Sequence, residues 1–261
     1  MPPMIANRTD LMYLTGIAYA FAALTAGGGV VGWGNSDYGG IVPSAIASRT
    51  DLVALSGSGY AFAALTASGG VVAWGGGIFG GSVPPAIASR TDLIALAGTD
   101  FSICALTASG SVVAWGTYSG EGTVPSEIAS RTDLVMLAST VHAFAALTAS
   151  GGVVAWGGNA GTVPVEIANR TDLVTLAGNG FAFAALTASG GVVTWGDSRY
   201  GGSIPEATQP LLTEVVAIYT SEYAFCALKA DNTVVVWGYA DAGNMSNVPA
   251  SLQDNISYYQ E

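Results

Sequence analysis

Residues 64 to 75 read Ala-Leu-Thr-Ala-Ser-Gly-Gly-Val-Val-Ala-Trp-Gly. A short apolar run ends in a glycine-containing turn, and a second run rich in β-branched residues follows, which is typical of two antiparallel strands joined by a tight connection. Neither run is long enough for a helix of ordinary length. The stretch therefore predicts a β-hairpin.

The same stretch recurs along almost the whole chain. All six tryptophans are followed by glycine, at positions 33, 74, 115, 156, 195 and 237. The triplet Arg-Thr-Asp recurs with a similar period, beginning at Arg8, Arg49, Arg90, Arg131 and Arg170. Such a period predicts a repeat architecture. We expect one domain over 1–261 with repeats near 1–40, 41–81, 82–122, 123–161, 162–202 and 203–244, leaving 245–261 as an extra half-repeat or closing strand.

Each repeat predicts three short strands and a weaker fourth one around its Val-Pro pair. Both faces of these strands are apolar, so each sheet must be covered on both sides. Four-stranded sheets of about 41 residues that cover one another are satisfied by the blades of a propeller. The sequence thus predicts an all-β fold, a six-bladed β-propeller with almost no helix. A seven-bladed or incomplete ring is the alternative.

The repeat from Ala64 to Gly75 resembles that of the regulator of chromosome condensation family, over essentially the whole chain. The segments after the tryptophans, such as Tyr38-Gly39-Gly40-Ile41-Val42-Pro43, are more similar to those of bacterial members, which include the propeller-type inhibitor of β-lactamase. The resemblance implies a bacterial protein that binds other proteins. Its relatives usually have seven blades, which keeps the alternative to six blades open.

Charge narrows the range of partners. Seven basic residues against 18 acidic ones give a net charge of -11, and such a surface repels phosphate, so we expect no nucleic-acid binding. Apolar stretches such as 18–26 are about half the roughly 20 residues that a membrane helix needs, so membrane insertion is not expected. Residues 1–14 do not read as a signal peptide. The location is left unassigned, with a bacterial secreted or surface-associated location open.

Few residues could support catalysis or bind a metal. His142 is the only histidine, and it occupies a position that is aromatic in the other copies, so we expect it to pack rather than react. Cys104 and Cys226 fall at equivalent positions in copies three and six, where we expect free, buried thiols. They are too few for a four-ligand zinc site. We predict no catalytic residue, no metal and no cofactor.

The copies differ at only one edge of the predicted sheets. The turn Thr66–Gly70 and the connector with Arg-Thr-Asp barely vary, and they should share one edge; we expect each arginine there to reach a carboxylate or carbonyl of the adjoining blade. The first-to-second and third-to-fourth loops vary, and they should share the opposite edge. Variable loops on a rigid scaffold are typical of a recognition surface, although drift in tolerant loops is an equally simple explanation.

Large aromatic and charged residues occur in these variable loops, where solvent-facing positions are usually small and polar. The predicted binding residues are Asp37, Tyr38, Phe79, Tyr118, Glu121, Asp197, Arg199, Tyr200, Tyr239 and Asp241. Such residues suit a non-enzymatic module for protein-protein interaction. A carbohydrate-binding propeller is the alternative, and a glycoside hydrolase using Asp37 and Asp197 is a remote one.

Overall fold

The computed structural model describes residues 3–118, 120 and 122–239. Within these residues the chain forms six antiparallel sheets of three strands each, so the all-β class and the six blades are confirmed. The chain separates into two compact units, 1–137 and 138–261, and each unit is described by itself. The prediction of one domain over the whole chain stays a prediction.

Each sheet contains a first, a second and a third strand in chain order. The first strands are β1 (Leu11–Gly16), β4 (Leu52–Gly57), β7 (Leu93–Gly98), β10 (Leu134–Ser139), β13 (Leu173–Gly178) and β16 (Val215–Thr220). The second strands are β2 (Ala20–Thr25), β5 (Ala61–Thr66), β8 (Ile103–Thr107), β11 (Ala143–Thr148), β14 (Ala182–Thr187) and β17 (Ala224–Lys229). The third strands are β3 (Val30–Gly34), β6 (Val71–Gly75), β9 (Val112–Trp115), β12 (Val153–Gly157), β15 (Val192–Gly196) and β18 (Val234–Gly238).

The predicted fourth strand does not form in the described residues. In the described residues the segment after each Val-Pro pair is a one-turn helix: α2 (Ser44–Ala47), α3 (Pro85–Ala88), α4 (Ser126–Ala129) and α5 (Val165–Ala168). The first copy has the equivalent helix α1 (Pro3–Ala6). Proline lacks the N–H that a paired strand needs, whereas its carbonyl is free to accept. The Pro43 carbonyl accepts from the N–H groups of Ile46 and Ala47, which closes the turn. A single helical turn thus stands where the fourth strand was predicted, while the fold stays all-β with little helix.

Short 3-10 helices follow several third strands. They are η1 (Ser36–Tyr38), η2 (Gly77–Phe79), η3 (Asn159–Gly161) and η4 (Ser198–Tyr200), with η5 (Gln209–Leu211) in the connector to the sixth sheet. The first, second and fourth of these begin two residues after the strand ends, and each of the three ends on an aromatic residue. They therefore set the direction in which that aromatic side chain leaves the blade.

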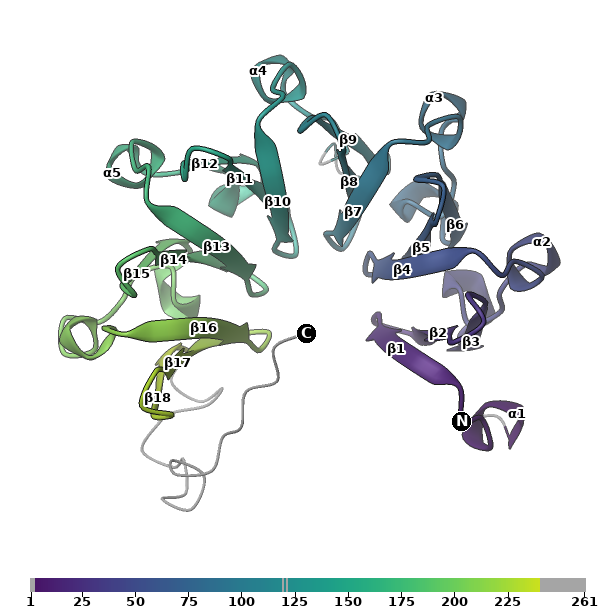
Figure 1. Ribbon diagram of the computed structural model, residues 1–261, viewed down its shortest axis with the longest axis horizontal. Coiled ribbons are helices and arrows are strands. Elements are labelled where there is room, and N and C mark those ends of the chain that lie inside the picture. The colour runs from purple at the N-terminus through teal and green to yellow at the C-terminus, as the bar shows by residue number, and fades with distance from the viewer. Residues whose placement is uncertain (1–2, 119, 121, 240–261) are drawn as a thin grey trace. The chain divides into compact units, whose positions relative to one another are not determined.

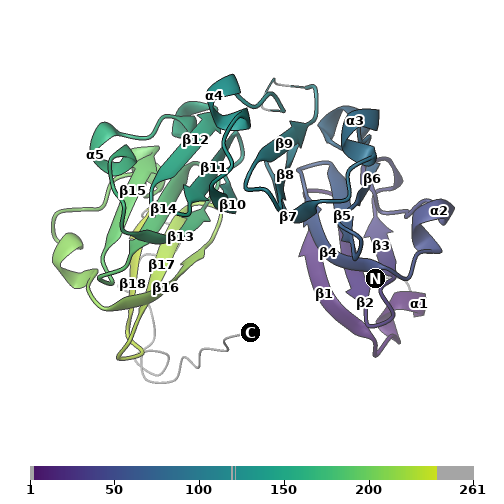
Figure 2. The ribbon, with the colours of Figure 1, turned by 45° about the horizontal axis from the view of Figure 1, so that its top comes forward.

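The second strands form the centre of the core. Every residue of β5, β11 and β14 is buried. In β5, Phe62 and Ala64 pack with the first blade and Ala63 and Leu65 with the third, which confirms that neighbouring blades cover both faces of this strand. Alanine alternates with larger residues there, so the sheets approach closely. Figure 2 shows the sheets β1–β3, β4–β6 and β7–β9 side by side within the first unit.

The repeated tryptophan joins a blade to the loop of the blade before it. The Trp74 ring is buried and stacks on Phe62 with ring centroids 5.4 Å apart, and its Nε1 donates to the carbonyl of Gly39 at 3.0 Å. Equivalent bonds run from Trp115 to Gly80, from Trp195 to Ala160 and from Trp237 to Gly201. These tryptophans thus hold the loop that follows the third strand of the preceding blade.

Candidate functional site

The two edges of the blades are built differently, and the nearly invariant edge holds neighbouring blades together. The backbone N–H of Leu52 donates to the carbonyl of Gly28 at 2.8 Å, so the start of the second blade bonds to a turn of the first. Gly28 has a φ of 72°, and a side chain at this position would collide with the carbonyl of Thr50. Only glycine meets both conditions without strain.

Each Arg-Thr-Asp triplet closes on itself. Arg49 donates from Nε and Nη2 to the two carboxylate oxygens of Asp51, at 2.8 and 2.5 Å, and the same fork forms in all five copies. The expectation that each arginine reaches the adjoining blade was therefore wrong. Residues two apart in an extended segment point to the same side, which brings the guanidinium to its own aspartate. Backbone hydrogen bonds make the contact between blades instead.

The variable edge brings together the two loops that differ between copies. The Asn35 N–H donates to the carbonyl of Tyr19 at 2.9 Å, so the loop after β3 lies on the loop before β2. The Asn35 side chain also accepts from the N–H of Asp37, which starts the helix η1. The Tyr38 ring is thereby delivered onto the Tyr19 ring, with centroids 5.2 Å apart.

Aromatic side chains from the two loops form a continuous row that we call the aromatic ladder. In the first unit its members are Tyr19, Tyr38, Tyr60, Phe79, Phe101 and Tyr118, with neighbouring centroids 4.6 to 6.2 Å apart. Tyr60 contacts four of the other rings, and burial raises the pKa of its hydroxyl, with smaller contributions from neighbouring groups. The rings cross both blade junctions of this unit.

A shorter aromatic ladder occurs in the second unit. Its members are Phe181, Tyr200, Tyr223 and Tyr239, at 4.4 to 6.3 Å. The Arg199 guanidinium lies 5.3 Å from the centre of the Tyr200 ring and donates to both carboxylate oxygens of Asp197. Those hydrogen bonds hold the pKa of Asp197 below its ordinary value. A fixed ion pair therefore borders the rings.

The structure places most of the predicted binding residues at this edge. Tyr38, Phe79 and Tyr118 belong to one ladder and Tyr200 and Tyr239 to the other. The exposed Asp37 precedes Tyr38, and Asp197 and Arg199 pair beside Tyr200. Glu121 and Asp241 lie outside the described residues.

Sequence reasoning missed half of each ladder. The rings at the start of the second strands are Tyr19, Tyr60, Phe101, Phe181 and Tyr223, and the sequence pattern by itself indicates only packing for them. Their recurrence at one position of every copy except the fourth was the available signal. The fourth copy has His142 there, and its next loop, Gly158–Gly161, has no aromatic residue.

The structure also locates the side chains that could bind a metal or transfer a proton. No group of three or more His, Cys, Asp or Glu side chains that could hold a metal ion occurs in the part of the chain that the structure describes. The lowered pKa of Asp197 is the reverse of what a general acid needs. Cys104 and Cys226 are free thiols, but only Cys104 is fully buried. Cys226 lies on the opposite face of β17 from Phe225 and Ala227, which pack on the fifth blade.

Comparisons with solved structures identify the fold. The chain is similar to the ectodomain of the receptor kinase CR4 from Physcomitrella patens (21% identity, TM-score 0.64, 89% of this chain and 62% of that one). It is also similar to human WBSCR16 (18%, 0.63, 88% and 76%) and to Prp20p from Saccharomyces cerevisiae (16%, 0.63, 87% and 72%).

These likenesses show a propeller fold of the kind found in yeast RCC1 (Prp20), at low sequence identity. The chain spans less than two thirds of the Physcomitrella ectodomain. No protein-family model matches the chain, and no curated protein matches it in sequence. Among the described residues no helix is long and apolar enough to cross a membrane.

Proposed function

We propose that this chain is a non-enzymatic binding module that contacts a protein partner through its aromatic ladder. The observation that carries the proposal is the exposure of rings that are nevertheless held in fixed positions. Tyr19, Tyr118 and Tyr239 expose 53, 60 and 44% of their surface, although each lies against neighbouring rings. Contiguous exposed aromatic surface on a soluble protein marks a site of interaction.

Stacking makes these rings suitable anchors for binding. A tyrosine has two side-chain torsions, and neighbours that already fix them reduce the entropy lost when a partner binds. Tyrosine is also enriched among the residues that carry most of the binding energy in interfaces. The net charge of -11 favours a partner whose contacting surface is basic at its rim.

The similar structures support the same class of function. Prp20p has binding properties toward Gsp1p and histones, and Kap60 is bound to yeast RCC1 (Prp20) in another of the similar structures. Gsp1p, histones and Kap60 are partners of Prp20p and are not proposed as partners of this chain. The sequence resemblance to bacterial members, the β-lactamase inhibitor included, remains a prediction, and neither inhibition nor nucleotide exchange is carried over because no contact residue for either can be matched.

Carbohydrate binding is less well supported. A sugar that stacks on an aromatic residue needs one free ring face, but the faces of Phe181 and Tyr223 lie against each other at 5.9 Å with an interplanar angle of 9°. The Tyr200 ring lies 4.4 Å from Phe181 as well. Because these rings pack face to face with one another, they present ring edges and hydroxyl groups to a partner. Edges and hydroxyl groups suit contact with a protein surface better than stacking with a sugar.

Comparative capture from lysate tests the proposal. A Tyr38→Ala plus Tyr200→Ala variant changes one residue in each ladder. The matched control, Arg49→Gln plus Arg170→Gln, changes two residues at the opposite edge. We expect a partner that wild type and the arginine variant retain and the tyrosine variant loses, with no displacement by free sugars. Unchanged capture by the tyrosine variant would refute the proposed surface, and displacement by a sugar on a glycan array would favour the lectin alternative.

A further inference from the structure

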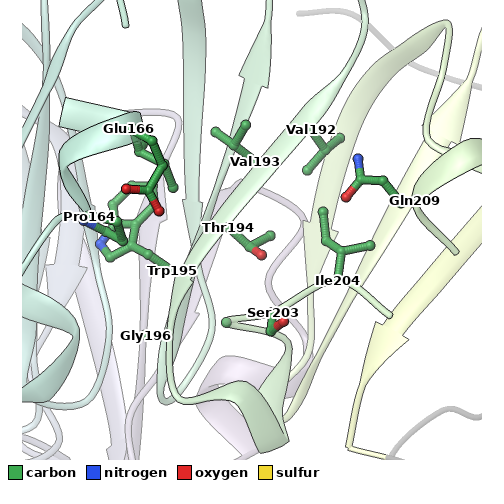
Figure 3. A pocket seen from close by; sticks show the side chains of 12 residues that line it. Pro164, Glu166, Val192, Val193, Thr194, Trp195, Gly196, Ser203, Ile204 and Gln209 are labelled. Carbon is green, nitrogen blue, oxygen red and sulfur yellow. The ribbon is translucent and has the colours of Figure 1, made fainter. Parts of the chain in front are cut away.

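The third strand of the fifth blade has an unpaired outer edge that lies in a groove. The predicted fourth strand is absent from the described residues, and β15 pairs only with β14 there. Within the same residues, no backbone hydrogen bond joins Val192–Gly196 to the connector that follows. The groove has a volume of about 470 Å³ and runs along the whole of β15 (Figure 3).

The backbone groups at this edge can be identified from the register. Thr187 N–H donates to the Gly191 carbonyl and Asp197 N–H donates to the Phe181 carbonyl, and between them hydrogen-bonded pairs alternate with non-bonded pairs. Val192, Thr194 and Gly196 therefore direct their N–H and C=O groups away from β14, and Gly202 packs against the carbonyl of Gly196, so Val192 and Thr194 carry the open part of the edge. A row of such groups is a template for one more strand.

Polar side chains surround the groove without satisfying one another. Figure 3 shows Glu166 and Gln209 on opposite sides of Thr194, with Ser203 below. In the described part of the chain none of these four side chains makes a hydrogen bond or ion pair. Val193 and Ile204 supply apolar surface between them. The groove thus combines an open strand edge, apolar contact and one carboxylate.

We propose that this groove binds an extended peptide of another protein, which adds to β15 as a fourth strand and places a lysine or arginine beside Glu166. Strand addition uses main-chain hydrogen bonds for affinity and alternate side chains for specificity. The carboxylate of Glu166 is the only charge among the residues that line the groove, so a cationic side chain complements it.

The charges of this chain exclude its own segments as the favoured occupant. Residues 240–261 contain Asp241, Asp254 and Glu261 and no basic residue. All seven basic side chains of the protein, which a second copy would have to offer, are already in ion pairs with aspartates. A basic strand must therefore come from a different protein.

The equivalent groove of the first blade is a natural comparison. It lies along β3, has a volume of about 330 Å³ and contains Gly32 where the fifth blade has Thr194. Val42 and Ile41 line it, and its only charged lining residue is Arg8, which is paired with Asp10, whereas the first copy has Met4 at the position of Glu166. We expect the basic strand to select the groove of the fifth blade.

The experiment uses the full chain and the peptide acetyl-Thr-Val-Lys-Val-Thr-Val-amide, with binding followed by fluorescence anisotropy and amide hydrogen exchange. We expect binding that slows exchange at Val192 and Thr194. A peptide N-methylated at alternate residues should not bind, because it cannot pair as a strand. Replacement of its lysine by glutamate should weaken binding.

Protein variants separate the two contributions. Glu166→Gln should weaken binding about two- to fivefold, as expected for one exposed ion pair, whereas Glu127→Gln at the equivalent position of α4 should not. Thr194→Pro removes an outward N–H and should weaken binding about tenfold, whereas Thr194→Ala, which restores the alanine of other copies, should bind normally.

Equal binding of the N-methylated peptide, or unchanged affinity in both Glu166→Gln and a correctly folded Thr194→Pro, would overturn the proposal. It would also be overturned if the β15 amides were protected before peptide is added, because the chain itself would then occupy the edge. If Thr194→Pro does not fold, the N-methylated peptide alone decides between strand addition and charge attraction.

Discussion

The invariant and variable edges of the blades differ in how their residues contact the neighbouring blade and in how much aromatic surface they expose. At the invariant edge a glycine turn fits against the carbonyl of the next blade, and backbone hydrogen bonds connect the two. At the variable edge backbone hydrogen bonds also join neighbouring blades, such as the one from Gly59 N–H to the Asp100 carbonyl at 3.0 Å. Aromatic side chains add contacts across the same junctions, and large rings stay partly exposed. The invariant edge repeats one glycine turn from copy to copy, whereas the ring positions of the variable edge tolerate exchange of Tyr for Phe.

The largest expected difference between the edges is at the glycine turn. Gly28→Ala places a methyl group against the Thr50 carbonyl in a left-handed conformation, so we expect a loss of about 2 kcal/mol or more in the free energy of unfolding. Gly27→Ala is the matched control, since no atom lies within 4 Å of its added carbon. Denaturant unfolding measures both, and equal stability of the two variants would contradict the backbone account.

Substitutions in the aromatic ladder should reduce the free energy of unfolding less than Gly28→Ala does, and they should reduce partner binding more. Tyr60 contacts four rings, so Tyr60→Ala should cost about 1 to 3 kcal/mol, whereas Tyr118→Ala, at the exposed end, should cost under about 1 kcal/mol. A double-mutant cycle of Tyr60 and Phe79 should show a coupling of about 0.5 to 1.5 kcal/mol. Additive effects would mean that the rings are neighbours without mutual stabilisation.

The arginine forks should contribute least. Each is about one third exposed, so Asp51→Asn should cost under about 1 kcal/mol despite its good geometry. High salt should remove most of that difference. A larger loss that salt leaves unchanged would show that the fork supports the blade junction after all.

The pH dependence of the variable edge has a definite sign. Because Arg199 lowers the pKa of Asp197 in the folded state, this carboxylate stabilises the fold above its unfolded pKa, near 3.8, and the contribution is lost as pH falls through the lower folded value. Asp197→Asn should therefore reduce the acid sensitivity of unfolding slightly. An unfolding curve of the variant that parallels wild type below pH 4 would contradict this assignment.

Much of this arrangement could be predicted because each sequence pattern recurs in several copies of the repeat. Strands, period and the grouping of loops by edge follow from apolar patterning and from chain direction. The one-turn helix after Pro43 could not be separated from a strand, because Val-Pro followed by short apolar residues suits both. The ion-pair partner of Arg49 could not be predicted, because it depends on the local backbone direction. The exposure of Tyr60 could not be predicted either, because an aromatic residue at this position suits both the core and the surface.

Site-specific photo-crosslinking tests the central claim most directly. A benzophenone side chain introduced at position 118 lies at the end of the aromatic ladder, and one at the exposed Ser48 lies beside an arginine fork at the other edge. We predict that a partner protein is crosslinked from position 118 and not from position 48. Crosslinking of the same partner from position 48 alone would place recognition on the invariant edge and contradict the account.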